Sequence, residues 1–318
     1  MNKILETTKR VAENSVFVKI DQARILEFSK NFDHGSVKHW LNAAPIDFGK
    51  FSDEEKLHFL FLFNSLSFSY WGEPKWTVED QGKKFGGSWG LVKALDKGIK
   101  NGFNLLDFDY CSKISREDFL KIFHGNVEIP LLEERWNILR ELGMVMVEKF
   151  QGRAANLVSE ANGDALKFLD LILENFPSFQ DVSIYNDQEV YFQKRAQQLV
   201  ADIFQLFDGI GFGEFKDTEE LTACADYKLP QILRKSGILV YADSLADKID
   251  NKIEIPHSSV EEMEIRANTI WAVEFIRQGV SKRQPNIKSF EINDHLWLAT
   301  QEKFPDDKPY HRTRTTAY

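Results

Sequence analysis

Residues 52–63 constrain the fold of this chain more than any other stretch of its sequence. Ser52 and Glu55 have the spacing of a capping box, in which each side chain accepts a hydrogen bond from the backbone N–H group of the other residue at the start of a helix. The residues that follow would make every side of such a helix apolar: Leu57, Phe59, Leu60, Phe61, Leu62 and Phe63. Because an apolar surface of this kind has to be covered by other elements, we expect a helix buried on most of its sides.

Helical periodicity runs through much of the remaining chain. Apolar residues spaced three and four apart predict amphipathic helices over residues 132–150, 168–176, 192–207 and 259–279. Pro177 is expected to end the second helix and Gly209 to follow the third, while Ser258 and Glu261 form a capping box before the fourth, which runs to Gly279. We expect residues 209–213 to form a turn after a helix, and residues 278–288 to form the most flexible loop.

Strand-like alternation is confined to two short stretches. Residues 76–85 turn near Asp80-Gln81-Gly82, and residues 182–192 turn near Asn186-Asp187, which is the pattern of a small hairpin in each case. The composition shows no break along the 318 residues, of which 43% are hydrophobic. We therefore predict a mainly α fold, a single compact helical domain over residues 1–318 with one or two small β-hairpins.

The charge balance limits the class of partner. Lys and Arg total 40 against 49 Asp and Glu, so the formal net charge is −9. A protein that grips long nucleic acid normally carries a concentrated basic face, because it has to neutralise several phosphates. A mononucleotide needs only one or two cations, so a small-molecule substrate is favoured over direct binding of nucleic acid.

Cysteine use and the missing motifs limit the class of chemistry. Cys111 and Cys224 lie far apart, so neither a disulfide framework nor a cysteine zinc site is expected, and a reducing compartment, the cytoplasm, fits best. No export signal or membrane-spanning run is present, and neither a dinucleotide-binding nor a P-loop motif occurs. The seven histidines are scattered, and we predict neither a metal ion nor a cofactor.

The first candidate site residue is Asp226. It follows uncharged residues that we expect to end a short helix, and it precedes a second helix that Pro230 helps to start. A carboxylate there could stabilise an oxocarbenium-like sugar or orient an attacking water molecule. On the residues alone, a structural role as the N-cap of the second helix is favoured over catalysis.

Two further segments offer binding groups. Aromatic residues are dense in FNSLSFSYW at 63–71 and could wall a slot for a flat heterocycle, although such a stripe is more often part of the core. Lys194 and Arg195 stand near the expected start of a helix, and a basic cluster lies near the C-terminus at 311–314. Either could hold one phosphate, although such basic residues more often form a solvated face.

Taken together, these segments resemble the queuosine salvage family, queuosine 5′-phosphate N-glycosylase/hydrolase. The matching stretches are FNSLSFSYW at 63–71, SWGLVKAL at 88–95, PLLEERWNIL at 130–139, EKFQG at 148–152, ENFPSFQDVS at 174–183, KRAQ at 194–197, VAD at 200–202, FKD at 215–217, ADYKLPQ at 225–231, VEEMEIRANTIWAVEFI at 260–276 and HRTR at 311–314. The likeness runs from about residue 57 to residue 318, and FKD followed by ADYKLPQ is its most specific part.

The resemblance implies a helical fold similar to DNA glycosylases, queuosine 5′-monophosphate as substrate and queuine as the released base. It implies Asp226 as the catalytic carboxylate. It also implies a substrate-binding set that includes residues of the aromatic, ADYKLPQ, KRAQ and C-terminal segments: Phe68, Trp71, Cys224, Tyr227, Lys228, Lys194, Arg195, Arg312 and Asp294. Asp294 departs from the family pattern D-x-x-L-W. In this chain Asn293 occupies the position of the acid in that pattern, and Asp294 stands one residue later.

Three functions follow from these observations. The first is hydrolysis of the N-glycosidic bond of a mononucleotide. The second is a non-catalytic protein that carries a queuine-like base, and the third is a lesion glycosylase acting within DNA or RNA. The acidic charge balance argues against the third, and incubation with queuosine 5′-monophosphate separates the first two.

Overall fold

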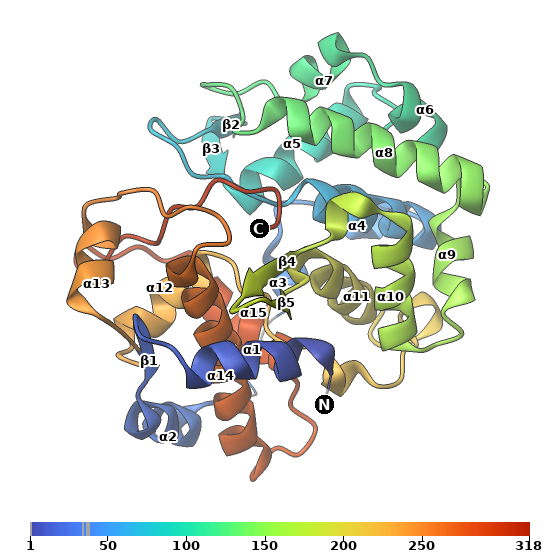
Figure 1. Ribbon diagram of the computed structural model, residues 1–318. Coiled ribbons are helices and arrows are strands. Elements are labelled where there is room, and N and C mark those ends of the chain that lie inside the picture. The colour runs from blue at the N-terminus through green and yellow to red at the C-terminus, as the bar shows by residue number, and fades with distance from the viewer. Residues whose placement is uncertain (1, 34, 36–38) are drawn as a thin grey trace.

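The computed structural model describes residues 2–33, 35 and 39–318, and they form a mainly helical protein (Figure 1). The helices of the first part of the chain are α1 (Lys3–Glu13), α2 (Gln22–Asn31), α3 (Trp40–Ala43), α4 (Asp53–Leu66), α5 (Ser88–Lys100), α6 (Phe108–Lys113), α7 (Arg116–Ile122) and α8 (Leu132–Phe150). They are followed by α9 (Ala154–Glu160), α10 (Ala165–Asn175), α11 (Lys194–Leu206), α12 (Lys228–Lys235), α13 (Asp243–Asp250), α14 (Val260–Ser281) and α15 (Ser289–Ala299). The predicted mainly α class is confirmed, whereas the likeness to DNA glycosylases and the single-domain boundary stay predictions.

The helix α4 forms as its sequence predicts. Ser52 is its N-cap, and the reciprocal capping box with Glu55 is present. Every residue from Leu57 to Leu66 is buried, because α5, α8, α9 and α11 pack around this helix. An element that is apolar all round therefore lies at the centre of the larger apolar core.

Both predicted hairpins are present. One consists of β2 (Thr77–Asp80) and β3 (Lys83–Gly86), and the other of β4 (Val182–Tyr185) and β5 (Gln188–Tyr191), each antiparallel. A third pair was not predicted: β1 (Val18–Ile20) lies antiparallel to β6 (Leu239–Tyr241). The buried carboxylate of Glu264 on α14 accepts hydrogen bonds from the backbone N–H groups of Val16, Phe17 and Val18, and so fixes the approach to β1.

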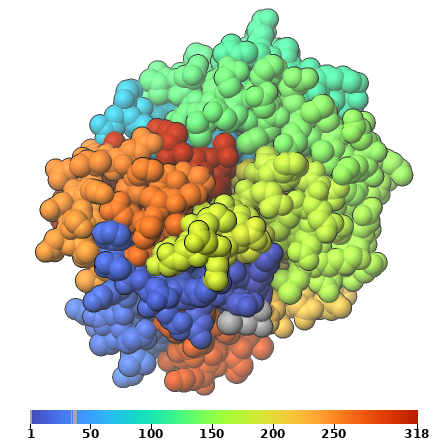
Figure 2. Space-filling view, in the orientation of Figure 1, coloured from blue at the N-terminus to red at the C-terminus, as the bar shows by residue number. Residues whose placement is uncertain are grey.

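The two ends of the chain build one side of the molecule together. Helices α1 and α2 pack against α14, and a second apolar core combines Val18 and Ile25 with residues between Ala223 and Leu296. The larger core is drawn almost wholly from the chain between Trp40 and Leu221. The C-terminal segment lies in a notch between these two parts, where the space-filling view shows it in red between orange and green surfaces (Figure 2).

Two details differ from the sequence predictions. The N-cap of α14 is Ser259, whose side chain accepts from the N–H of Glu262, so the capping box assigned to Ser258 and Glu261 was wrong by one residue. The predicted flexible loop was also too long, because α14 continues to Ser281. Within the described part of the chain, no helix combines the length and apolar character that crossing a membrane requires.

Candidate active site

Two adjoining chambers lie where the two apolar cores meet, and they share the lining residues Ser67, Ser88, Lys194, Asp226 and Trp297. We call the first the acidic chamber; it is completed by Trp40, Phe63, Gln198, Cys224, Leu229, Asn293 and Asp294. We call the second the basic chamber; it is completed by Tyr70, Lys75, Gly86, Gly87, Tyr227, Lys228, Gln301 and Tyr318. Six of the ten residues predicted for the site are thereby brought together, with Asp226 on the boundary between the chambers.

Asp226 combines the two roles that the sequence left open. Its Oδ1 accepts hydrogen bonds from the backbone N–H groups of Lys228 (2.7 Å) and Leu229 (3.0 Å), so it caps the first turn of α12. Its second carboxylate oxygen accepts no hydrogen bond from the described residues, and the half-buried side chain lines both chambers. The short helix expected directly before it is absent, because residues 221–226 have no regular secondary structure.

Three lysines give the basic chamber its charge. Lys194 at the start of α11 is buried, and burial lowers its pKa, while the nearby carboxylate of Asp226 acts in the opposite direction. Burial also lowers the pKa of Lys228. The third, Lys75, was missed in the sequence; its side chain is exposed overall, but packing around its ammonium group and the charges of Lys228 and Lys303 lower its pKa to about 8.

The start of α5 adds unpaired backbone donors to the basic chamber. Gly87 precedes the helix with φ at +62° and offers no capping side chain, so the first N–H groups of this 13-residue helix have no side-chain acceptor. Gly86, Gly87 and Ser88 all line the chamber. Such a helix start attracts anions, because its N–H groups and dipole favour negative charge.

The acidic chamber ends in polar groups from α15. Asn293 Oδ1 accepts from the N–H of Cys224 at 2.9 Å, and Asn293 Nδ2 donates to Asp294 Oδ1 at 3.3 Å. Both side chains therefore lie at the chamber. Burial, together with the negative charge of nearby Asp202, raises the pKa of Asp294 to about 8.

Asp202 on α11 is a site-associated residue that sequence reasoning missed. Its Oδ1 accepts from Trp40 Nε1 at 2.6 Å and its Oδ2 from Asn64 Nδ2 at 2.9 Å, and burial raises its pKa to about 7. A signal was available, because Asp202 interrupts the apolar stripe of Val200 and Ile203. A carboxylate on a buried helix face normally has a specific purpose.

The other four predicted residues do not line the chambers. Phe68 is 1% exposed and lies beneath the buried guanidinium groups of Arg135 and Arg195, at 4.0 Å and 5.2 Å from the ring centre. Arg195 is itself buried and donates to the carbonyl oxygens of Ser65 and Ser178, so the solvated face expected of this basic pair was wrong.

Trp71 packs against the C-terminal segment of the chain, to which Arg312 belongs. Trp71 packs in a small cluster with Tyr227 and Tyr318, and its Nε1 donates to the carbonyl oxygen of Thr313 at 3.0 Å. Arg312 pairs with Glu73. Trp71 therefore supports two residues of the basic chamber from behind, as a core residue does.

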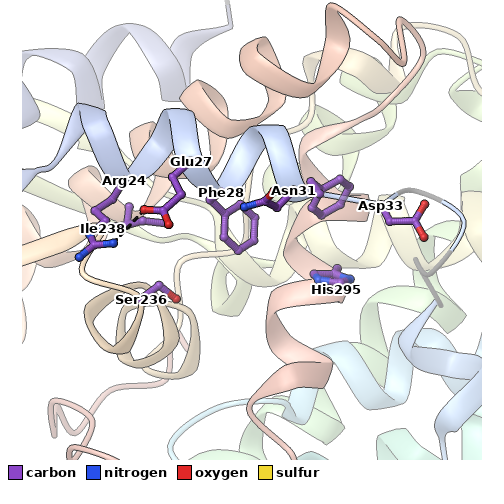
Figure 3. Close-up of a pocket in the computed structure, with 9 residues that line it drawn as sticks. Arg24, Glu27, Phe28, Asn31, Asp33, Ser236, Ile238 and His295 are labelled. Atoms are coloured by element: carbon purple, nitrogen blue, oxygen red, sulfur yellow. Dashed lines mark hydrogen bonds and ion pairs between the residues drawn. The ribbon is translucent and has the colours of Figure 1, made fainter.

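A more open hollow of about 750 Å³ lies between α2, α15 and the end of α12 (Figure 3). Arg24 and Glu27 on its rim pair with each other at 2.8 Å and are exposed, and Phe28 and His295 also line it. None of the residues predicted for the site lines this hollow. The candidate active site is therefore placed in the two chambers, where the carboxylates and buried cations converge.

Comparisons with known proteins point to one family. The family described as "Queuosine salvage protein" matches residues 49–318. The chain is 38% identical over 323 residues to a protein of Sphaerobacter thermophilus, covering 99% of this chain and 97% of that protein. It is 34% identical to a protein of Mus musculus, covering 98% of each chain, and 29% identical to one of Schizosaccharomyces pombe, covering 95% of this chain and 92% of the relative. Each of the three carries the name Queuosine 5′-phosphate N-glycosylase/hydrolase.

Proposed function

The chain belongs to the queuosine salvage protein family, and from this premise we infer that it hydrolyses the N-glycosidic bond of queuosine 5′-phosphate and releases queuine, with Asp226 as the catalytic carboxylate. One observation carries the assignment to Asp226. It is the carboxylate that borders both chambers, and one of its oxygens accepts no hydrogen bond from the described residues while the other is fixed by the start of α12.

The geometry supports a stabilising role at the ribose. Cleavage of an N-glycosidic bond places positive charge on the sugar, and a carboxylate held in a cleft of low polarity stabilises that charge or aligns the attacking water. The base of queuosine is a 7-deazapurine, which lacks the N7 atom that many nucleosidases protonate to expel the base. Stabilisation of the sugar should therefore contribute more to the rate here.

The charges of the two chambers support one placement of the substrate. The 5′-phosphate fits the basic chamber, with Lys75, Lys194 and Lys228 and the start of α5 as its binding groups. The base fits the acidic chamber, where Trp40 and Trp297 offer aromatic faces and Cys224 and Asp294 line the wall. In this placement Tyr227 lies beside the phosphate, while Phe68, Trp71, Arg195 and Arg312 act by holding the residues that line the site.

The substrate is proposed to be a free nucleotide in the cytoplasm. The net charge of −9 opposes the approach of a nucleic acid, and both cysteines, Cys111 and Cys224, are buried as free thiols. The three lysines of the basic chamber suffice for a single phosphate. A lesion glycosylase, in contrast, has to bind a polyanion before it acts.

Incubation of the purified protein with queuosine 5′-phosphate, followed by chromatography for the free base, tests the activity. We expect queuine to accumulate with the wild-type protein and about 10²-fold more slowly with Asp226→Asn. Exposed Asp208, which follows α11, provides a matched control, and Asp208→Asn should retain the wild-type rate. Binding of the nucleotide without any release of base would instead support the non-catalytic carrier.

A further inference from the structure

Asp202 and Asp294 form a pair of buried carboxyl groups at the end of the acidic chamber. They are 1% and 5% exposed. Trp40 links them, because its Nε1 donates to Asp202 and its backbone N–H donates to Asp294 Oδ2 at 3.4 Å. Gln205, one turn after Asp202 on α11, also donates to Asp294 Oδ2, at 3.1 Å.

This pair lacks a cation. Across residues 2–33, 35 and 39–318, neither carboxylate forms an ion pair, although buried carboxylates are normally paired with a positive group. The charge of Lys194 acts on Asp202, and this lysine lies on the boundary with the basic chamber. Other titratable groups nearby are Cys224, Asp226 and His39; the first two supply no positive charge.

The hydrogen bonds around the pair suit two different protonation states. Within the described part of the chain, the hydrogen-bond partners of the two carboxyl groups are N–H donors, which suits ionised carboxylates. Two acceptors beside them, Asn64 Oδ1 and Gln205 Oε1, are buried and accept no hydrogen bond from the described residues. A protonated carboxyl group could donate to either oxygen, so the same surroundings can also hold a carboxyl proton.

We propose that Asp202 and Asp294 share a proton in the empty protein and release it when a base carrying a positively charged amine enters the acidic chamber. This inference rests on the proposed function and specifies which feature of the base is recognised. Queuine has such an amine in the side arm of its ring system. The cation takes the place of the proton as the counter-charge of the pair, and the proton passes to the solvent. Asp294 contacts the ligand in this scheme, and Asp202 is a positioning residue that acts through it.

The protonation of the pair gives the inference a pH dependence with a defined sign. Burial raises the pKa of both groups, so the pair holds a proton near neutral pH and loses it as the pH rises through about 7 to 8. Adjacent His39 does not titrate in this range, because burial lowers its pKa to about 3. Affinity for a cationic base should therefore rise by up to about tenfold per pH unit from about pH 6 until the pair is ionised.

The competing use of an acid here is recognition of the neutral N1–H and 2-amino edge of the ring, which requires no positive charge. The compound 7-deazaguanine keeps that edge and lacks the amine arm, so it distinguishes the two. Calorimetric titration of the wild-type protein with each base, in phosphate and in Tris buffer near pH 7, measures the protons released on binding. We expect queuine to release close to one proton and 7-deazaguanine close to none.

Asp202→Asn adds a test on the protein side. It should abolish proton release and flatten the pH dependence of queuine binding, whereas Asp208→Asn, which removes an exposed charge beyond the same helix, should leave both unchanged. Thermal melting checks that Asp202→Asn folds. If this variant does not fold, the comparison of proton release by queuine and 7-deazaguanine still tests the inference. Equal proton release by the two bases, or none with queuine, would overturn the inference. Release of queuine from the nucleotide is assayed in parallel, and its absence would count against the proposed function instead.

Discussion

Replacing Asp226 by Asn isolates the charge of this carboxylate from its role as a helix cap. In the structure, Oδ1 accepts from the N–H groups of Lys228 and Leu229, and an Asn side chain can keep both hydrogen bonds. What is lost is the negative charge that we propose to face the ribose. Removal of one such stabilising group typically slows an enzyme about 10²-fold or more, which corresponds to about 2.7 kcal/mol in the activation free energy.

Replacement by Ala removes both roles. The free energy of unfolding should then fall by a further ~1 kcal/mol, the usual loss when a capping side chain is truncated. The pKa of Lys194 gives an independent measure of the charge on Asp226, because this carboxylate raises that pKa while burial lowers it. In Asp226→Asn, the pKa of Lys194 should therefore be lower than in the wild-type protein.

The assay measures queuine release under single-turnover conditions, with melting temperature and nucleotide affinity determined for each variant. We expect Asp226→Asn to melt near the wild-type temperature and to bind the nucleotide while turning it over slowly. A well-folded Asp226→Asn protein that releases queuine at close to the wild-type rate would refute the catalytic role. The capping interaction would then be the whole function of this residue.

Three further perturbations test other parts of the site. Lys75→Met should lower kcat/KM for the 5′-phosphate by about 10-fold and leave the unphosphorylated nucleoside unaffected, and equal losses on both would remove Lys75 from phosphate binding. Because the pKa of Lys75 is lowered to about 8, its charge is lost as the pH rises, so the preference for the phosphorylated substrate should decline gradually above about pH 8 and persist in Lys75→Arg. Trp71→Ala should reduce the free energy of unfolding by about 3–5 kcal/mol in denaturant titrations, as expected for a buried tryptophan. A stable variant with weakened substrate binding would instead show that Trp71 contributes to the binding site. Affinity for duplex DNA and tRNA should be negligible at physiological salt, and sub-micromolar, salt-dependent binding in a filter or anisotropy assay would contradict this.

The accuracy of the sequence predictions follows the range of the interactions involved. The start of α4 and both hairpins were predictable, because capping boxes, tight turns and periodicity act over a few residues. The pairing of β1 with β6 was not, since Val18 and Tyr241 are brought together only by packing on α14. The capping error at Ser259 arose because two consecutive serines offer the same local signal.

The residues of the site differ in how predictable they were for the same reason. Asp226, Lys194 and Lys228 came from segments whose order resembles a known family. Lys75 lies in none of these segments, and Asp202 lies in VAD at 200–202, a matching stretch to which the sequence assigned no role. Lys75 enters the basic chamber beside the start of α5, and Asp202 approaches Asp294 through Trp40, so each acquires its role from residues distant in sequence.

The order of charges along the two chambers gives a physical reason for the orientation of the substrate. Lys75 and Lys228 place positive charge at one end, Asp226 lies on the boundary, and Asp202 and Asp294 place carboxyl groups at the other end. A nucleotide with an anionic phosphate at one end and a cationic amine on its base complements this sequence in one direction only. In the reverse direction the phosphate would meet the carboxyl pair and the amine would meet the lysines, which costs electrostatic energy because like charges repel. In the placement that we propose, the favoured direction brings the bond between ribose and base to Asp226, so the charges that select the ligand would also position its reacting bond.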